Sequence, residues 1–411
     1  MSNGTMGDTP RSERLHIAIF GRRNAGKSSL INALTSQAIA IVSPVAGTTT
    51  DPVYKSMEIP PIGPVVLIDT AGIDDAGEIG KLRIKKTLEV LNQTDLLVLT
   101  MDAELETGDY ETDLINQARA RGLPVVGVLH KIDLHPDLAP QKLSESFGIP
   151  VLAVSSLTGQ GLGRLKELII DLAPKEHATR TILGDLVDAG DTVVLVTPID
   201  QAAPKGRLIL PQVQTIREIL DRNACAYVMQ DQDLPQALEN LRRRPKLVIT
   251  DAQVFDRVDQ ALPPEVPLTA FSVLFARYKG ELATLVAGVA AVEQLQPGDK
   301  VLIAEACTHH RVDDDIGTVK IPQMLQRRVG GQLDLTWASG YTLPEALDGF
   351  KLIIHCGACM ISRRQMLHRM TLAKNAGVAI VNYGVLIAYL RGILPRALTP
   401  FPTTEITAPS S

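Results

Sequence analysis

The chain is poor in aromatic residues, in cysteines and in long apolar runs. Phe, Trp and Tyr make up 4% of its 411 residues, and cysteine occurs 4 times. Cysteines this few and unevenly spaced do not make the disulfide framework of a small secreted domain. The longest apolar run, residues 282–292, is shorter than the roughly 18 residues that a membrane span needs. The polar segment 1–14 lacks the apolar core of a signal peptide, so we expect a cytoplasmic protein with no membrane segment.

Neither sign of charge is in large excess. Lys and Arg number 41 and Asp and Glu 46, which gives a net charge of −5. This balance, together with the scarcity of aromatic side chains, argues against a broad nucleic-acid-binding surface. Hydrophobic residues make up 45% of the chain, an ordinary content for globular proteins.

Short apolar runs alternate with amphipathic stretches along the chain, a pattern typical of parallel α/β domains. We predict three consecutive α/β domains with mainly parallel sheets, at residues 1–175, 176–264 and 265–411. The first boundary follows Pro174, and the second follows the proline-rich segment 263–267, because consecutive prolines resist both helix and central strand. The expected strands are 15–20, 65–68, 95–101, 124–129, 150–154, 192–196, 227–229, 246–249, 300–304, 333–337, 352–354 and 378–381.

The segment Gly21 to Ser28 has the pattern G-x-x-x-x-G-K-S between an expected strand and an expected helix. Glycines let the backbone curl so that its N–H groups point at phosphate oxygens, and the helix N-terminus reinforces this. Lys27 would reach the β- and γ-phosphates, and Ser28 would hold Mg²⁺. Asp69 ends another apolar strand and would organise the metal, while the Gly72 N–H can sense the γ-phosphate. The sequence therefore predicts a P-loop nucleotide-binding fold for the first domain.

Further motifs resemble the tRNA-modification and Era-type group of translation-factor-like GTPases. Residues 47–51 are similar to the first switch of that group, which places Thr49 on Mg²⁺. Residues 155–157 are similar to its base-contacting loop. The guanine motif of the group, Asn-Lys-x-Asp, is here His130-Lys131-Ile132-Asp133. Asp133 can still accept hydrogen bonds from the guanine N1 and N2 groups, which adenine does not offer.

We expect slow catalysis in this site. Ile73 stands where many small GTPases have a water-orienting glutamine, and isoleucine cannot position water. In the resembling group, an asparagine at the position of Asn24 helps to bind K⁺, so the resemblance implies GTP hydrolysis that K⁺ stimulates. Lys27, Asn24 and Thr49 are the expected catalytic residues, and His130 leaves the strength of guanine binding open. The predicted nucleotide-site residues are Gly21, Asn24, Ala25, Gly26, Lys27, Ser28, Ser29, Thr49, Asp69, Gly72, His130, Lys131, Asp133, Ser155 and Ser156, with Ser28 and Thr49 on Mg²⁺.

Three of the cysteines follow two expected strands. Cys307 to His310 follows strand 300–304, and His355 to Cys359 follows strand 352–354. Ligands gather beyond the carboxyl ends of parallel strands, so these thiolates and imidazoles are expected to meet there. Soft thiolates select zinc or an iron–sulfur cluster, and a closed zinc site of three cysteines and one histidine stays an alternative. Cys225 lies outside any motif and is expected to be a buried small hydrophobe.

The spacing Cys-x-His, then a long gap, then His-Cys-x-x-Cys resembles that of the FeFe-hydrogenase maturation GTPases. That family also has the order GTPase domain, dimerisation domain, iron–sulfur cluster-binding domain. The resemblance implies a 4Fe–4S cluster held by Cys307, Cys356 and Cys359, with His309 and His355 as candidates for a fourth ligand. It further implies a homodimeric scaffold and carrier that hydrolyses GTP with Mg²⁺ and K⁺. Such a carrier would assemble the diiron subcluster and deliver it to the apo FeFe-hydrogenase catalytic subunit, with two radical SAM maturases as further partners.

An RNA- or ribosome-associated GTPase with a structural zinc site is the alternative that the motifs leave open. The acidic charge balance and the lack of interleaved aromatic residues count against it. A self-sufficient iron–sulfur enzyme is a third reading, but no acid–base pair in the sequence supports it. The metal content of the protein, iron or zinc, separates the first two possibilities.

Overall fold

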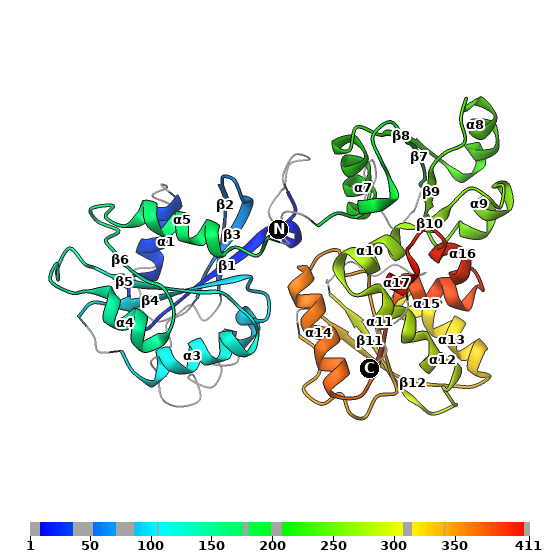
Figure 1. Cartoon of the computed structure of the whole chain (residues 1–411). Helices are drawn as coiled ribbons and strands as arrows, with labels where there is room; N and C mark the ends of the chain where they lie inside the picture. The colour runs from blue at the N-terminus through cyan, green and yellow to red at the C-terminus, as the bar shows by residue number, and fades with distance from the viewer. Residues whose placement is uncertain are drawn as a thin grey trace. The chain divides into compact units, whose positions relative to one another are not determined.

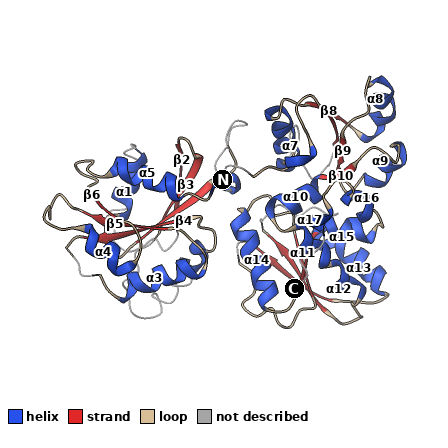
Figure 2. Ribbon diagram, viewed as in Figure 1, coloured by secondary structure: helices blue, strands red, loops and turns tan. Residues whose placement is uncertain are grey.

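The chain divides into two compact units, Met1–Thr179 and Arg180–Ser411 (Figure 1). In each unit, helices and strands interleave to give sheets covered by helices (Figure 2). The predicted α/β fold with mainly parallel sheets is confirmed. Within the described ranges no helix is both long and apolar enough to cross a membrane. The computed structural model describes residues 9–35, 52–70, 86–104, 107–175, 180–198, 208–306, 315–340 and 342–406.

The first unit contains one six-stranded sheet in the order β2-β3-β1-β4-β5-β6. All its pairings are parallel except that of β2 with β3. In β1, Ile17 and Ile19 lie in one apolar core and Phe20 lies in another, because successive side chains of a strand point to opposite faces. Burial on both faces is typical of parallel sheets covered by helices. The elements are β1 (Leu15–Phe20), α1 (Lys27–Thr35), β2 (Val53–Ile59), β3 (Gly63–Asp69), β4 (Leu96–Asp102), α3 (Asp109–Ala120), β5 (Val125–His130), α4 (Pro140–Phe147), β6 (Val151–Val154) and α5 (Leu162–Leu172).

The sequence did not predict β2, whereas it predicted the other five strands of this sheet. Polar and apolar residues mix along β2, and most of its side chains are exposed or half-buried. An edge strand of this kind is held by backbone hydrogen bonds to one neighbour, here β3, and needs little apolar content. Its sequence therefore carries a weaker signal than that of a buried strand.

The second unit contains two parallel four-stranded sheets, in the orders β10-β9-β7-β8 and β12-β11-β13-β14. One continuous apolar core includes residues of both sheets. The first sheet and its helices are β7 (Thr192–Val196), α7 (Leu210–Asp221), β8 (Cys225–Met229), α8 (Leu234–Asn240), β9 (Leu247–Thr250), α9 (Phe255–Ala261) and β10 (Leu268–Ala270). The remainder is α10 (Phe271–Lys279), α11 (Leu282–Ala287), α12 (Val289–Glu293), β11 (Lys300–Glu305), η4 (Ile316–Lys320), α13 (Ile321–Val329), β12 (Asp334–Ser339), β13 (Leu352–His355), α14 (Arg363–Asn375), β14 (Ala379–Asn382), α15 (Tyr383–Leu390), α16 (Leu394–Leu398) and α17 (Thr403–Ile406).

The proline-rich segment 263–267 follows α9 but does not end the sheet. Strand β10 begins directly after Pro267 and pairs with β9, and the Pro267 carbonyl accepts a hydrogen bond from the Val248 N–H at 2.9 Å. A proline is tolerated at the start of an edge strand, where its missing N–H costs no ladder bond. The sheet thus continues beyond the prolines that were expected to close it. The division at 1–175, 176–264 and 265–411 stays a prediction.

In the strand at the opposite edge of this sheet, β8, every residue is exposed or half-buried. Tyr227 is 47% exposed and Val228 is 44% exposed. Cys225, which we expected to be buried, is exposed as well, so that expectation is wrong. The reason is its place on an edge strand, which the local sequence does not reveal.

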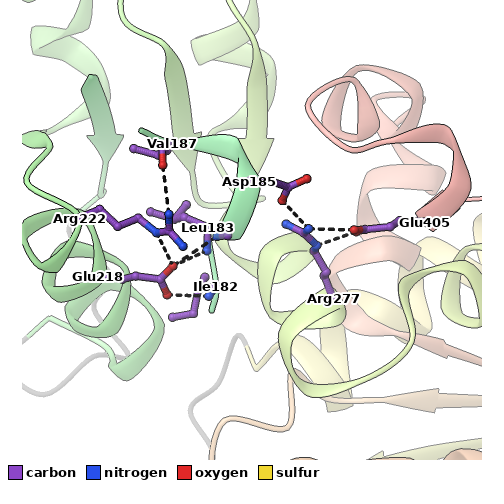
Figure 3. A network of polar contacts seen from close by, with 9 residues as sticks. Ile182, Leu183, Asp185, Val187, Glu218, Arg222, Arg277 and Glu405 are labelled. Atoms are coloured by element: carbon purple, nitrogen blue, oxygen red, sulfur yellow. Dashed lines mark hydrogen bonds and ion pairs between the residues drawn. The ribbon is translucent and has the colours of Figure 1, made fainter. Parts of the chain in front are cut away.

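A polar network ties the beginning of the second unit to helices α7, α10 and α17 (Figure 3). Arg277 on α10 forms ion pairs at 2.6 Å with Asp185 and with Glu405 on α17. Glu218 on α7 accepts a hydrogen bond from the Ile182 N–H. Burial acts to raise the pKa of Asp185, but the hydrogen bond and charge of Arg277 outweigh it, so this pKa lies below its ordinary value.

Replacing Arg277 by Gln should lower the free energy of unfolding at neutral pH by about 1 kcal/mol, a modest loss because Asp185 is 49% exposed and screened by solvent. The difference in stability between the parent and the variant should have its full size above about pH 4, near the unfolded-state pKa of an aspartate. It should shrink as the pH falls through the folded-state pKa of Asp185, because a carboxyl group with a lowered pKa stabilises the fold only while it is ionised. Chemical denaturation of both proteins across pH measures this difference.

The matched control is Arg217→Gln, which removes an exposed ion pair with Asp221 within α7. It should leave the stability unchanged. Equal stability losses in the two variants would contradict a specific role for Arg277.

Candidate functional site

The phosphate loop begins where β1 ends and leads into α1. Gly21 (φ 154°) packs so closely on β4 that an added Cβ would lie 2.2 Å from the Thr100 carbonyl oxygen. The Lys27 ammonium is buried and donates hydrogen bonds to the carbonyl oxygens of Gly21 (2.9 Å) and Arg22 (2.7 Å). The fold therefore holds a positive charge at the loop, as binding of a phosphate requires.

Ser28 and Asp69 are brought together as predicted for a magnesium site. Ser28 lies in the first turn of α1 and donates a hydrogen bond of 2.6 Å to the Asp69 carboxylate at the end of β3. Burial raises the pKa of Asp69, and the Ser28 hydrogen bond and the charge of Lys27 partly offset this. A carboxylate and a hydroxyl are oxygen ligands of the kind that Mg²⁺ prefers. The other predicted contacts to Mg²⁺ and the γ-phosphate, Thr49 and Gly72, lie outside the described residues.

His130 connects the predicted base-binding segments to the phosphate loop. Its Nε2 is 2.7 Å from the Ser156 hydroxyl oxygen, and its ring lies so close to Gly26 that a Cβ there would be 2.2 Å from Nδ1. Burial first, and then the charge of Lys131, lower the pKa of His130, so the ring is neutral at neutral pH. Lys131 itself has a positive φ of 62° and forms an ion pair with Asp102 at 2.6 Å. The segments 21–29, 130–133 and 155–156 thus form one site, and the roles of their residues in binding nucleotide stay predictions.

Two ion pairs of this site escaped the sequence analysis. Arg22, within the phosphate loop, donates two hydrogen bonds of 2.8 Å to Glu111, which is buried in the first turn of α3. Asp102, at the end of β4, is the partner of Lys131. Each pair joins residues that lie far apart in the sequence, so no local pattern points to them.

The candidate metal centre lies at the carboxyl ends of β11 and β13. These strands are parallel neighbours in which Ala304 pairs with His355. Ala306 directly precedes Cys307 in the sequence, and its N–H donates a hydrogen bond of 3.2 Å to the sulfur of Cys356. Burial raises the pKa of the Cys356 thiol, and the N–H groups of Ala306 and Ala358 partly offset this rise. Hydrogen bonds to a cysteine sulfur of this kind are typical of iron–sulfur sites.

His355 is fully buried and both of its ring nitrogens have partners. Nδ1 lies 2.7 Å from the Cys356 carbonyl oxygen, and Nε2 lies 2.6 Å from a guanidinium nitrogen of Arg369 on α14. Burial and the charge of Arg369 lower the pKa of His355 to about 3, so the imidazole is neutral. The role of His355 as a fourth iron ligand stays a prediction. The arrangement does not favour it, because both ring nitrogens already have partners.

Among the described residues, no group of three or more His, Cys, Asp or Glu side chains is arranged to hold a metal. Cys307, His309 and His310 lie outside those residues. Cys356 and Cys359 are not joined in a disulfide. Two cysteines on one turn, with N–H donors at a sulfur, fit either a cluster or zinc by the chemistry of their donor set.

The mainly parallel sheet with a phosphate loop after β1 and an aspartate at the end of β3 defines a P-loop nucleotide-binding domain. A model of the 50S ribosome-binding GTPase family matches residues 16–131. The hydrogen maturase F dimerization domain matches residues 182–280, and the hydrogen maturase F tetramerization domain matches residues 283–400. The chain belongs to the hydrogen maturase F family.

Relatives among characterised proteins match the GTPase region. The tRNA modification GTPase MnmE of Symbiobacterium thermophilum is 37% identical over 175 residues, which cover 42% of this chain and 37% of that protein. MnmE of Koribacter versatilis is 38% identical over 169 residues, which cover 40% of this chain and 35% of that protein. The chain thus spans little more than a third of the length of these relatives. The solved G domain of the T. maritima FeoB iron transporter is 26% identical with a TM-score of 0.32, covering 39% of this chain and 98% of that one.

Replacing Gly26 by Ala should weaken GTP binding by at least about tenfold, because the new Cβ collides with His130 and the residue has φ 89°. Titration with a fluorescent GTP analogue measures the affinity. Gly63→Ala is the matched control, since Gly63 has φ 91° at the start of β3 but no atom within 4 Å of an added Cβ. The control should lose stability but keep the GTP affinity. Unchanged affinity in Gly26→Ala would refute the close contact between His130 and the phosphate loop.

Proposed function

We propose that this protein is a GTP-hydrolysing scaffold that binds a 4Fe–4S cluster, assembles the diiron subcluster of FeFe-hydrogenase and delivers it to the apo-hydrogenase. The observation that carries the proposal is the parallel pairing of β11 with β13. It sets the Cys356 turn beside Ala306, the residue before Cys307, within a chain that also has a phosphate loop. Membership of the hydrogen maturase F family supports the same function.

Cys307, Cys356 and Cys359 are the proposed cluster ligands. Three thiolates leave one iron of a 4Fe–4S cluster without a cysteine, and that iron would supply the position at which cargo attaches. The protein's own part is to present the thiolates and to donate N–H groups to the Cys356 sulfur. Cys356 is half-buried, which would limit the access of water to this side of the cluster.

In the nucleotide site, we propose that Lys27 binds the β- and γ-phosphates, Ser28, Thr49 and Asp69 organise Mg²⁺, and Asp133 selects guanine. Lys27 contacts the backbone of the phosphate loop, and Ser28 contacts Asp69. Both contacts support these assignments. Hydrolysis would be slow because Ile73 cannot orient water. K⁺ bound with the help of Asn24 would stimulate it by adding positive charge at the leaving phosphate.

Self-association is part of the proposal. A strand that exposes apolar side chains at a sheet edge, as β8 does with Tyr227 and Val228, is a surface suited to pairing with a second copy of the chain. The matches to a dimerization and a tetramerization domain support an oligomer. The FeFe-hydrogenase catalytic subunit and the radical SAM maturases are the proposed transient partners.

The second candidate is an RNA- or ribosome-associated GTPase with a structural zinc site. The match of residues 16–131 to a family described as ribosome-binding favours it, as does the similarity to tRNA modification GTPases. Zinc without visible absorption in the purified protein, together with co-purifying RNA, would support this candidate. Iron and acid-labile sulfide would support the carrier.

The carrier function predicts that Cys356→Ser abolishes activation of apo-hydrogenase and lowers the bound iron, because Cys356 is a proposed ligand. GTP hydrolysis should persist, since the nucleotide site lies in the other compact unit. Iron analysis, electron paramagnetic resonance and in vitro hydrogenase activation measure these effects. Cys225→Ser, which changes an exposed thiol outside the motif, is the control and should behave as the parent. Normal activation by Cys356→Ser would rule out the carrier function.

GTP turnover should be faster in K⁺ than in Na⁺, and Asn24→Gly should remove the difference. Glycine is the suitable replacement because Asn24 has a positive φ of 61°, which glycine adopts without strain. Steady-state phosphate release at matched ionic strength measures the effect. Equal rates in the two salts for the parent chain would exclude the K⁺ site, and a K⁺ effect that survives in Asn24→Gly would exclude Asn24.

A further inference from the structure

Arg369 is a charged residue in an unexpected place. It lies in the middle of α14 and is 2% exposed. Its guanidinium donates to His355 Nε2 at 2.6 Å and to the Gly340 carbonyl oxygen, and its Nε has no hydrogen-bond partner. Among the described residues no carboxylate pairs with it. A buried guanidinium without an anion is costly, so the surroundings should supply negative charge.

The hydrogen bonds define the tautomer of His355. Arginine can only donate, so Nε2 of His355 must be the acceptor nitrogen. The Cys356 carbonyl can only accept, so Nδ1 must carry the proton. His355 thus links the guanidinium of Arg369 to the backbone of Cys356, and neither ring nitrogen is left for a metal.

The guanidinium of Arg369 lies one imidazole ring away from the backbone of Cys356, because His355 contacts Arg369 through Nε2 and the Cys356 carbonyl oxygen through Nδ1. A carboxylate lies on the other side of this segment. Glu305 ends β11, is 3% exposed and directly precedes Ala306, whose N–H donates to the Cys356 sulfur. Tyr383 donates a hydrogen bond of 3.2 Å to Glu305. One buried cation and one buried carboxylate therefore influence the same cysteine.

We propose that Arg369 is the buried counter-charge of the iron–sulfur cluster, that it raises the reduction potential of the cluster, and that His355 is a positioning residue between Arg369 and Cys356 rather than an iron ligand. The proposal rests on the cluster at Cys356 proposed above. Thiolate ligation gives such a cluster net negative charge, which increases on reduction, so a fixed nearby cation favours the reduced form. Net charge and hydrogen bonding near the sulfurs are known to set the potentials of iron–sulfur clusters.

The test is a redox titration of the reconstituted full-length protein, followed by electron paramagnetic resonance. Arg369→Gln should shift the cluster potential to a more negative value, and Arg369→Lys should lie between it and the parent because the charge is kept while the two-point hydrogen bonding is lost. Glu305→Gln removes the opposite charge and should shift the potential to a more positive value. This variant keeps the proposal testable if Arg369→Gln does not fold.

If Arg369→Gln and Glu305→Gln have the same cluster potential as the parent, at the same iron content, the role of Arg369 is overturned. A parent chain that binds no iron would instead refute the proposed cluster itself. For His355, pulsed resonance of the reduced cluster should give the same nitrogen couplings in the parent and in His355→Asn. Loss of an imidazole coupling in that variant would make His355 a ligand and overturn its positioning role.

Discussion

Both candidate sites depend on hydrogen bonding between parallel strands, because this pairing brings the carboxyl ends of neighbouring strands to the same edge of a sheet. In the first unit, β1 and β3 end at the phosphate loop and at Asp69. In the second unit, β11 and β13 end at the two cysteine segments, with Ala304 paired with His355. A shift of this register would separate the functional loops while leaving their sequences intact.

At each of the two sites, a buried cationic side chain donates hydrogen bonds to backbone carbonyl oxygens. The Lys27 ammonium is held by backbone carbonyl oxygens of its own loop, and the Arg369 guanidinium is held by a backbone carbonyl and by neutral His355. No carboxylate is among the described hydrogen bonds of Arg369. In the proposed function an anion would meet each cation, a phosphate at Lys27 and a thiolate-bound cluster at Arg369, and its binding would offset the cost of burying the charge.

Strands with mostly apolar, buried residues were predicted well, and the bounds of β1, β4, β7 and β13 were found within a residue or two. The edge strand β2 was missed because most of its side chains are exposed or half-buried. Strand β10 is buried but was missed because it has only three residues and directly follows Pro267. The edge strands β8 and β12 were found only in part, from their apolar residues. Cys225 was misjudged for a related reason, since edge exposure is decided by the order of strands and not by neighbouring residues.

The phosphate loop and the spacing of the cysteines were determined by the sequence alone, since each is a local pattern whose chemistry follows from residue type and order. The family followed from the same motifs. Only the tertiary structure decided that His130 lies against Gly26, that Arg22 pairs with Glu111, and that His355 is engaged by Arg369. Those contacts join residues that are distant along the chain, and they arise from sheet order and helix packing, which no local pattern encodes.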